Sequence, residues 1–110
     1  PKHGKAGARE FLEAYKAKVR NPHWRIFRIA ETEDALFVEG VDAFDTADGH
    51  HAVVPYMGIL EFDGDLITGW RDYFDRGSAD RSAAGMPLPD YTRALTARPA
   101  VLEPSRRTRN

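Results

Sequence analysis

Hydrophobic residues recur every three or four positions near the start of the chain. Between Gly7 and Val19 the apolar side chains fall on one side of a helix, and charged residues cover much of the rest: Ala8, Phe11, Leu12, Tyr15 and Val19. Asn21 and Pro22 stop this pattern, because proline has no N–H to donate and disfavours a helical conformation at the residue before it. We therefore expect one amphipathic helix over residues 7–19.

After Pro22 the hydrophobic period changes from that of a helix to that of a strand. The expected strands cover residues 24–29, 35–44, 51–62 and 66–74. Short polar turns separate them, and a hairpin turn favours the Asp48-Gly49 pair. Parallel neighbours would need long crossover connections, so these short turns predict a continuous antiparallel meander. The fold class is α+β: a helix packed on a curved, four-stranded antiparallel sheet.

Beyond Asp75 the composition shifts to small and polar residues. Residues 76–85 carry little apolar surface, 86–89 are extended around two prolines, 90–97 have the pattern of two helical turns, and 105–110 form a basic tail. We expect residues 1–76 to form the domain and residues 77–110 an irregular, flexible C-terminal arm. The few arginines of the tail do not indicate a nucleic-acid site.

The composition narrows the classes of function. A chain of 110 residues that is 42% hydrophobic fits one domain with a small core, and its net charge of −1 gives no sign of a nucleic-acid or membrane surface. The chain has no cysteine for a disulfide framework or thiolate nucleophile, and the spacing of its four histidines does not suit a zinc site. His50 and His51 are expected to be exposed at a hairpin tip. We expect no cofactor and no metal.

The sequence shows neither a membrane span nor a signal peptide. No apolar run approaches the roughly 20 residues that a membrane-spanning helix needs, and nothing like a secretory leader precedes the first element. We therefore expect a soluble, cytoplasmic protein whose partner is a small molecule or a second copy of itself.

Two aspartates lie on the more apolar face of their predicted strands. Side chains alternate across a strand, so each aspartate shares a face with apolar neighbours: Leu36, Val38, Gly40 and Phe44 for Asp42, and Trp70 and Phe74 for Asp72. Arg71 and Tyr73 point the opposite way, which suits helix packing or a dimer contact. Tyr56 is expected in the same interior as the aspartates, as buried core or as a phenolic donor.

A buried ionised carboxylate is costly, and burial raises its pKa. If Asp42 and Asp72 face one cavity with their pKa values pushed apart, they form a general acid and a general base. The alternative is that one or both are solvated at a sheet edge or accept hydrogen bonds from nearby Tyr, Trp or backbone groups. A one-residue slip at a bulge would invert these faces.

The stretch from Gly58 to Asp75, which contains Trp70-Arg71-Asp72-Tyr73-Phe74-Asp75, resembles the last hairpin of limonene-1,2-epoxide hydrolase and its SnoaL-like relatives. These proteins belong to the nuclear-transport-factor-2-like superfamily. Val38-Glu39-Gly40-Val41-Asp42 is similar to the preceding strand, and Gly4 to Leu12 resembles the helix before it. The resemblance covers residues 1–76. It implies a cone-shaped, cystatin-like α+β fold and a homodimer.

The resemblance also implies an Asp-Arg-Asp site that adds water to a hydrophobic epoxide. Asp42 would orient and deprotonate the water, and Asp72 would protonate the epoxide oxygen. The pocket would be lined by Leu36, Val38, Gly40, Tyr56, Trp70 and Phe74. The bridging arginine of the family precedes its first aspartate by two residues, where this chain has Gly40. Without that cation, one carboxylate should hold a proton or the two should lie further apart.

A second departure from the family concerns the segment upstream of the helix. In the family a Tyr and an Asn of that segment hold the water, whereas this chain begins at Pro1. The pocket is therefore expected to be open on one side unless a second subunit covers it. An open, wet pocket weakens electrostatic catalysis.

Three functions fit these features. The first is an epoxide-hydrolase-like enzyme. The second is a SnoaL-like cyclase or a ketosteroid-isomerase-like proton shuttle, which needs no arginine. The third is a non-catalytic ligand-binding or dimerisation module. The ionisation of the two carboxylates separates an enzyme from a module, because a working acid-base pair has at least one clearly raised pKa.

Overall fold

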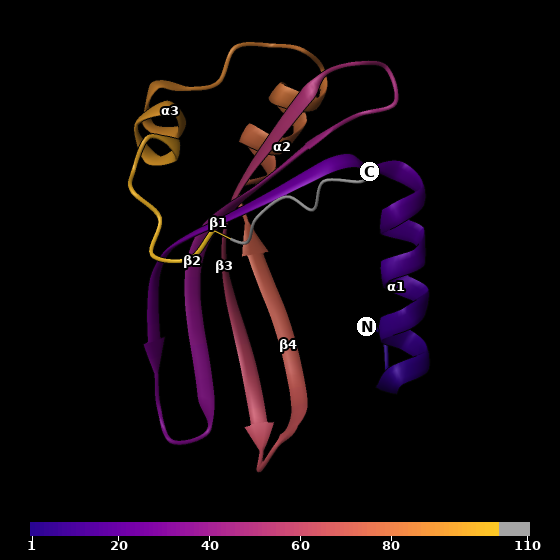
Figure 1. Cartoon of the computed structure of the whole chain (residues 1–110). Helices are drawn as coiled ribbons and strands as arrows, with labels where there is room; N and C mark the ends of the chain where they lie inside the picture. Colours follow the sequence, from indigo (N-terminus) through magenta and orange to yellow (C-terminus); the bar gives the residue numbers. More distant parts are fainter. Residues whose placement is uncertain (104–110) are drawn as a thin grey trace, which may run out of the picture.

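The four strands lie in the sheet in the order in which they occur in the sequence. The computed structural model of the chain describes residues 1–103. Its elements are α1 Gly4–Lys18, β1 Arg20–Glu31, β2 Ala35–Asp45, β3 His51–Asp63, β4 Leu66–Phe74, α2 Arg76–Ala83 and α3 Asp90–Thr96. All three strand pairs are antiparallel, so the predicted α+β fold and meander are confirmed (Figure 1). The basic tail expected over residues 105–110 lies outside the described residues.

Strand β1 is longer than the sequence predicts. It begins at Arg20 instead of Trp24 and includes Asn21 and Pro22, which lie where the pairing with β2 shifts register between Arg20 and His23. Asn21 has a φ of 51° there, in the left-handed region that asparagine tolerates. β1 is an edge strand, where a proline is tolerated at a bulge. Pro22 therefore does not break the strand, and the helix has already ended at Lys18.

Each face of the sheet carries a small apolar cluster. One face carries Ile26, Val38 and Tyr56, with Leu36 packed against them; we call it the site face. The opposite face carries Phe27, Val41 and Val53, with Leu88 and Leu95 packed against them; we call it the helix face. Helices α2 and α3 therefore lie over the helix face, and the site face is left without them.

Helix α2 forms where the sequence predicts an irregular segment, and that expectation needs a correction. The Asp75 carboxylate caps the helix by accepting the backbone N–H of Ser78 at 3.0 Å. The Ser82 hydroxyl accepts the backbone N–H of Val53 on β3 at 2.8 Å, and the Ser78 and Thr92 hydroxyls bond to each other at 2.7 Å. Small polar residues make these buried contacts, so α2 lacks the apolar periodicity by which helices are recognised in a sequence.

The chain returns to β1 after α3. The two helical turns predicted over residues 90–97 are confirmed as α3. Beyond it, Ile26 donates its backbone N–H to the Leu102 carbonyl at 2.8 Å, and Val101 donates to the Ile26 carbonyl at 2.8 Å. The described part of the C-terminal arm is thus tied to β1 as well as to β3. The domain boundary after residue 76 stays a prediction.

Helix α1 is confirmed as an element, but it stands beside the sheet instead of packing flat upon it (Figure 1). None of its residues is buried, and Phe11 and Leu12 are 50% and 45% exposed. Tyr15 reaches the sheet, where its ring meets the Phe44 ring edge-on with 6.1 Å between centroids. Only Val19 separates α1 from β1, which leaves no loop to fold the helix back onto the sheet. The predicted packing of this helix therefore needs a correction, and the site face is open.

None of the helices in residues 1–103 combines the length and the apolar character that crossing a membrane requires.

Candidate acid-base site

The strand register places both aspartates on the site face. Directly paired residues in an antiparallel sheet point to the same side. The pairs across β3 are Asp42 with Val54, Gly40 with Tyr56, Val38 with Gly58, Gly58 with Asp72, Tyr56 with Phe74, and Leu60 with Trp70. Leu36 pairs with Leu60 and completes the set. The sheet therefore gathers the predicted catalytic and pocket residues on one face, from three strands.

Asp72 lies over a position where β3 has no side chain. A Cβ added to Gly58 would be 2.6 Å from Asp72 Oδ1 and 3.3 Å from Val38 Cγ2. Gly58 thus leaves room for the carboxylate to lean inward across the sheet. Partial burial of its carboxylate raises the pKa of Asp72, and a hydrogen bond from the Trp70 indole partly offsets that rise.

Asp42 is the more strongly perturbed of the two acids. Burial raises its pKa to about 6, and the negative charge of Asp72 adds to the rise. Among residues 1–103, no cation lowers the pKa of either carboxylate. The two acids therefore influence each other without a positive charge between them, as expected from Gly40.

The backbone of β1 closes the position where the family has its arginine. A Cβ added to Gly40 would come closer than 3.0 Å to the Arg25 carbonyl oxygen and to 3.2 Å from Ile26 Cα. Such distances to backbone atoms are not relieved by rotating a side chain. Gly40 thus permits a close backbone approach, and no side chain fits at that position unless β1 moves.

Tyr56 is the cross-strand partner of Gly40 and is 9% exposed. Its hydroxyl accepts a hydrogen bond from the Trp24 indole N–H. Burial raises the pKa of Tyr56 to about 12, and the charges of Asp42 and Asp72 raise it further against the effect of the Trp24 bond. Tyr56 therefore keeps its proton at neutral pH, within the field of both carboxylates.

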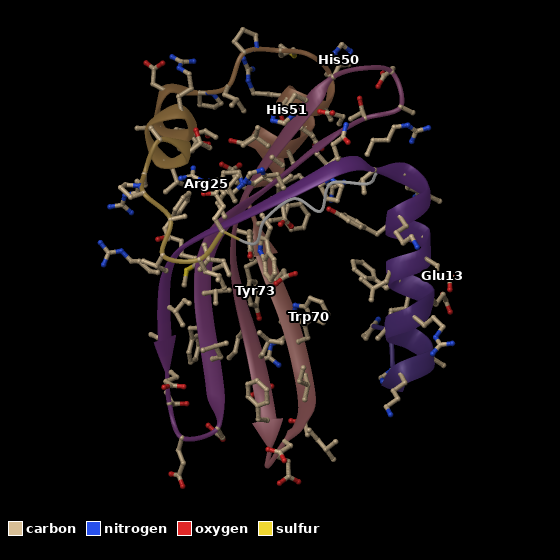
Figure 2. All side chains as sticks on the ribbon, in the orientation of Figure 1. Glu13, Arg25, His50, His51, Trp70 and Tyr73 are labelled. Atoms are coloured by element: carbon tan, nitrogen blue, oxygen red, sulfur yellow. The ribbon has the colours of Figure 1, made fainter. Side chains whose placement is uncertain are left out.

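The site is open on the side of β4, so the expectation that both carboxylates lie inside a cavity needs a correction. Asp42 is half-buried, but Asp72 is exposed, and Trp70 and Phe74 are 55% and 50% exposed. Strand β4 is an edge strand, and α1 stands away from it, which explains this correction. Figure 2 shows Trp70 on the side of β4 that faces α1. The site is therefore an open surface of the sheet. It is buried at Val38, Gly40 and Tyr56 and exposed to solvent along β4.

Two aromatic residues that were not predicted from the sequence, Trp24 and Tyr15, also belong to this site. Trp24 of β1 pairs with Asp42 of β2, and the alternation of side chains along the first strand could have indicated its face. Tyr15 lies on the apolar side of α1, and its pKa is raised by burial and by the charge of Asp42. Helix periodicity alone does not indicate which element such a ring meets.

The histidines lie apart from this site. Figure 2 shows His50 and His51 near the tip of the β2–β3 hairpin, away from Trp70. His51 Nδ1 is 2.9 Å from the Asp45 carboxylate, which explains its position there. Residues 1–103 contain no group of three or more His, Asp or Glu side chains arranged to hold a metal ion.

The raised pKa of Asp42 predicts a pH-dependent stability. An unperturbed aspartate has a pKa of 3.8, whereas that of Asp42 is about 6 in the fold, so the folded state binds more protons between these values and stability falls as the pH rises through that window. Relative to wild type, Asp42→Asn is expected to gain about 1–3 kcal/mol in free energy of unfolding between pH 4 and pH 8. Urea denaturation at both pH values measures this difference.

The control is Asp65→Asn, which removes a carboxylate from the exposed turn between β3 and β4, so the difference between the two variants isolates the effect of position 42. An Asp42→Asn effect independent of pH would show that Asp42 titrates normally in the folded protein.

Comparison with known protein families gives a match over most of the chain. The family described as limonene-1,2-epoxide hydrolase catalytic domain matches residues 2–79, which include α1, the whole sheet and both aspartates. No curated protein matches the chain.

Proposed function

Because the chain belongs to the limonene-1,2-epoxide hydrolase family, we propose that its site face binds a hydrophobic epoxide and that Asp42 and Asp72 catalyse the addition of water to it. One observation carries the proposal: β2 and β4 present two carboxylates with raised pKa values on one apolar face. Paired acids with perturbed pKa values in an apolar site are typical of general acid-base catalysis.

The surroundings of the two acids support different roles. Asp42 has the more strongly raised pKa and is half-buried, which suits the general acid. Asp72 is open to water and accepts a hydrogen bond from Trp70, which stabilises the carboxylate form of a general base. These roles are the reverse of those that the resemblance implies.

In the proposed step, Asp72 takes a proton from a water molecule whose oxygen attacks an epoxide carbon. The carbon–oxygen bond of the ring breaks as Asp42 gives its proton to the epoxide oxygen. The product is a diol, and the net proton transfer from Asp42 to Asp72 is reversed through bulk water. Exposed rings of Trp24, Trp70 and Phe74 supply apolar surface for the ligand.

A proton shuttle on a ketone is the second candidate, favoured by Gly40. The backbone of β1 excludes a bridging cation, and an isomerase or cyclase that moves one proton needs none. A non-catalytic binding module is the third candidate, favoured by the open side at β4. The raised pKa values of both aspartates weigh against it, because a site that had lost its chemistry would have no reason to keep them.

The proposal is tested by incubating a panel of cyclic and long-chain epoxides with the protein in ¹⁸O-labelled water. One ¹⁸O atom in a diol product, formed faster than in buffer alone, supports water addition. Absence of diol from every epoxide, with isomerisation of a cyclic enone or exchange of α-protons in a ketone, would favour the proton shuttle. Absence of both reactions in the folded protein would favour the binding module.

A homodimer is proposed through the uncovered part of the helix face. Met57 and Tyr73 are paired across β3 and β4, point to that side and are 52% and 65% exposed, so they leave apolar surface open to solvent in a monomer. Sedimentation equilibrium is expected to give twice the chain mass of 12.4 kDa, and Met57→Glu should give the monomer. A monomeric wild type at micromolar concentrations would contradict the proposal, and Glu33→Lys in the turn before β2 serves as the control.

A further inference from the structure

The geometry around Tyr56 points to a role beyond the core. We infer that the Tyr56 hydroxyl, held by Trp24, donates a hydrogen bond to the oxygen of a ligand bound on the site face. The inference rests on the proposed function, because it names the group that meets the ligand oxygen beside Asp42 and Asp72.

The hydrogen-bonding inventory of Tyr56 leaves one proton free. An indole nitrogen is a donor only, so in the bond with Trp24 the Tyr56 oxygen is the acceptor. A phenol that accepts in this bond still has its own proton to donate. Among residues 1–103 no acceptor for that proton is found. A buried donor without an acceptor is costly, and a ligand oxygen or a water would satisfy it.

The position of Tyr56 fits this role. It pairs with Gly40, the position at which β1 excludes any side chain, and its ring edge lies 3.5 Å from the point where a Gly58 Cβ would project beside Asp72. Its oxygen meets Trp24, the cross-strand partner of Asp42. The Tyr56 side chain therefore lies between the two carboxylates, with its ring edge toward Asp72 and its hydroxyl at Trp24, the partner of Asp42.

Tyr56 would act as a neutral donor and keep its proton throughout. When the epoxide ring opens, negative charge develops on its oxygen before Asp42 has delivered its proton. A fixed O–H group at that oxygen stabilises the charge without a proton transfer of its own. The chemical class of the ligand follows: an apolar molecule with an oxygen that accepts a hydrogen bond, set between Tyr56 and Asp42.

The test uses Tyr56→Phe, which keeps the ring and its burial and removes only the hydroxyl. For the epoxide that the wild type turns over best, kcat is expected to fall about 10²–10³-fold, as when one oxyanion donor is removed. The pH profile should keep its shape, because Tyr56 does not titrate in the working range. Tyr91→Phe in α3, over the helix face, also removes only a phenolic hydroxyl; it is the matched control and should change neither quantity.

A second measurement does not depend on turnover. Acetophenone is an apolar ketone whose carbonyl stretching frequency falls when the oxygen accepts a hydrogen bond. Its infrared spectrum, bound to wild type, is expected to show such a shift, which is lost in Tyr56→Phe with an increase in Kd of about 3- to 10-fold. Trp24→Phe, which removes the N–H that orients Tyr56, should broaden the shifted band and lower kcat by a smaller factor.

The outcomes separate the two proposals. A shifted carbonyl that depends on Tyr56, without epoxide turnover, supports the donor and rejects the hydrolase. Epoxide turnover that is unchanged in Tyr56→Phe overturns the inference and leaves the hydrolase intact. An unshifted carbonyl in wild type, or a shift that survives in Tyr56→Phe, also overturns it.

Discussion

Asp42→Asn is expected to lower kcat/KM for a hydrophobic epoxide by about 10²–10⁴-fold, the usual contribution of a general acid or base. Asparagine has nearly the shape of aspartic acid but has no proton to give to the epoxide oxygen. The loss should appear mainly in kcat, because the apolar contacts that bind the ligand remain. Steady-state kinetics of purified wild type and variant, with folding checked by circular dichroism, measure the effect.

The pH profile identifies which acid holds the proton. If Asp42 is the general acid, the activity of wild type falls as the pH rises through about 6, where Asp42 loses its proton. Asp72→Asn should cost a similar factor, because no carboxylate then takes the proton of the attacking water. Asp65→Asn in the β3–β4 turn is the control and should keep full activity. Full activity in Asp42→Asn would remove this residue from the mechanism.

Stability and activity are expected to move in opposite directions at Asp42. The same substitution that lowers turnover should stabilise the fold at alkaline pH, because it removes an ionised group from a half-buried, apolar place. A residue that only supports the fold would show the two changes in the same direction. This opposition is therefore a sign of a functional site that the fold tolerates at a cost in stability.

Alternation along the strands was sufficient to place Asp42 and Asp72 on one face, because β2 and β4 are free of bulges at those residues. The extension of β1 through Pro22 was not predictable, since a proline ends most regular patterns and is tolerated here only by an edge strand with a register shift. Helix α2 was missed for a related reason: it docks through Ser78 and Ser82, and local rules place serine in turns.

Two features of the site, the contact of Trp24 with Tyr56 and the close approach of β1 to Gly40, depend on how the strands pair with one another. Alternation within the first strand shows on which face of the sheet Trp24 lies. Its contact with Tyr56 also depends on the register of β1 with β2 and of β2 with β3, and alternation within one strand does not specify either register. The absence of an arginine at position 40 was visible in the sequence. The reason for it, the close backbone of β1, was not.

Restoring the arginine of the family at Gly40 is expected to disrupt the fold instead of improving catalysis. Even Gly40→Ala should lower the free energy of unfolding by about 1–3 kcal/mol, because its Cβ would overlap the carbonyl oxygen of Arg25 and crowd Ile26 Cα, and backbone atoms in a paired strand have little room to move. Gly40→Arg should destabilise further. Urea denaturation measures both changes. If Gly40→Ala unfolds at the same urea concentration as wild type, the backbone of β1 can move away from the added methyl group at little cost.

Gly58→Ala provides the matched comparison two residue pairs along the sheet. Its Cβ would meet Asp72 Oδ1, the end of a side chain that can rotate away, so its stability should stay closer to wild type than that of Gly40→Ala. The displaced carboxylate should nevertheless lower kcat, by about 10²-fold if Asp72 moves by the order of 1 Å. The two glycines thus separate two demands on this sheet: Gly40 admits the backbone that holds β1 in place, whereas Gly58 admits the carboxylate that is proposed to act on water. A Gly58→Ala variant with full turnover would place the reacting water away from Asp72.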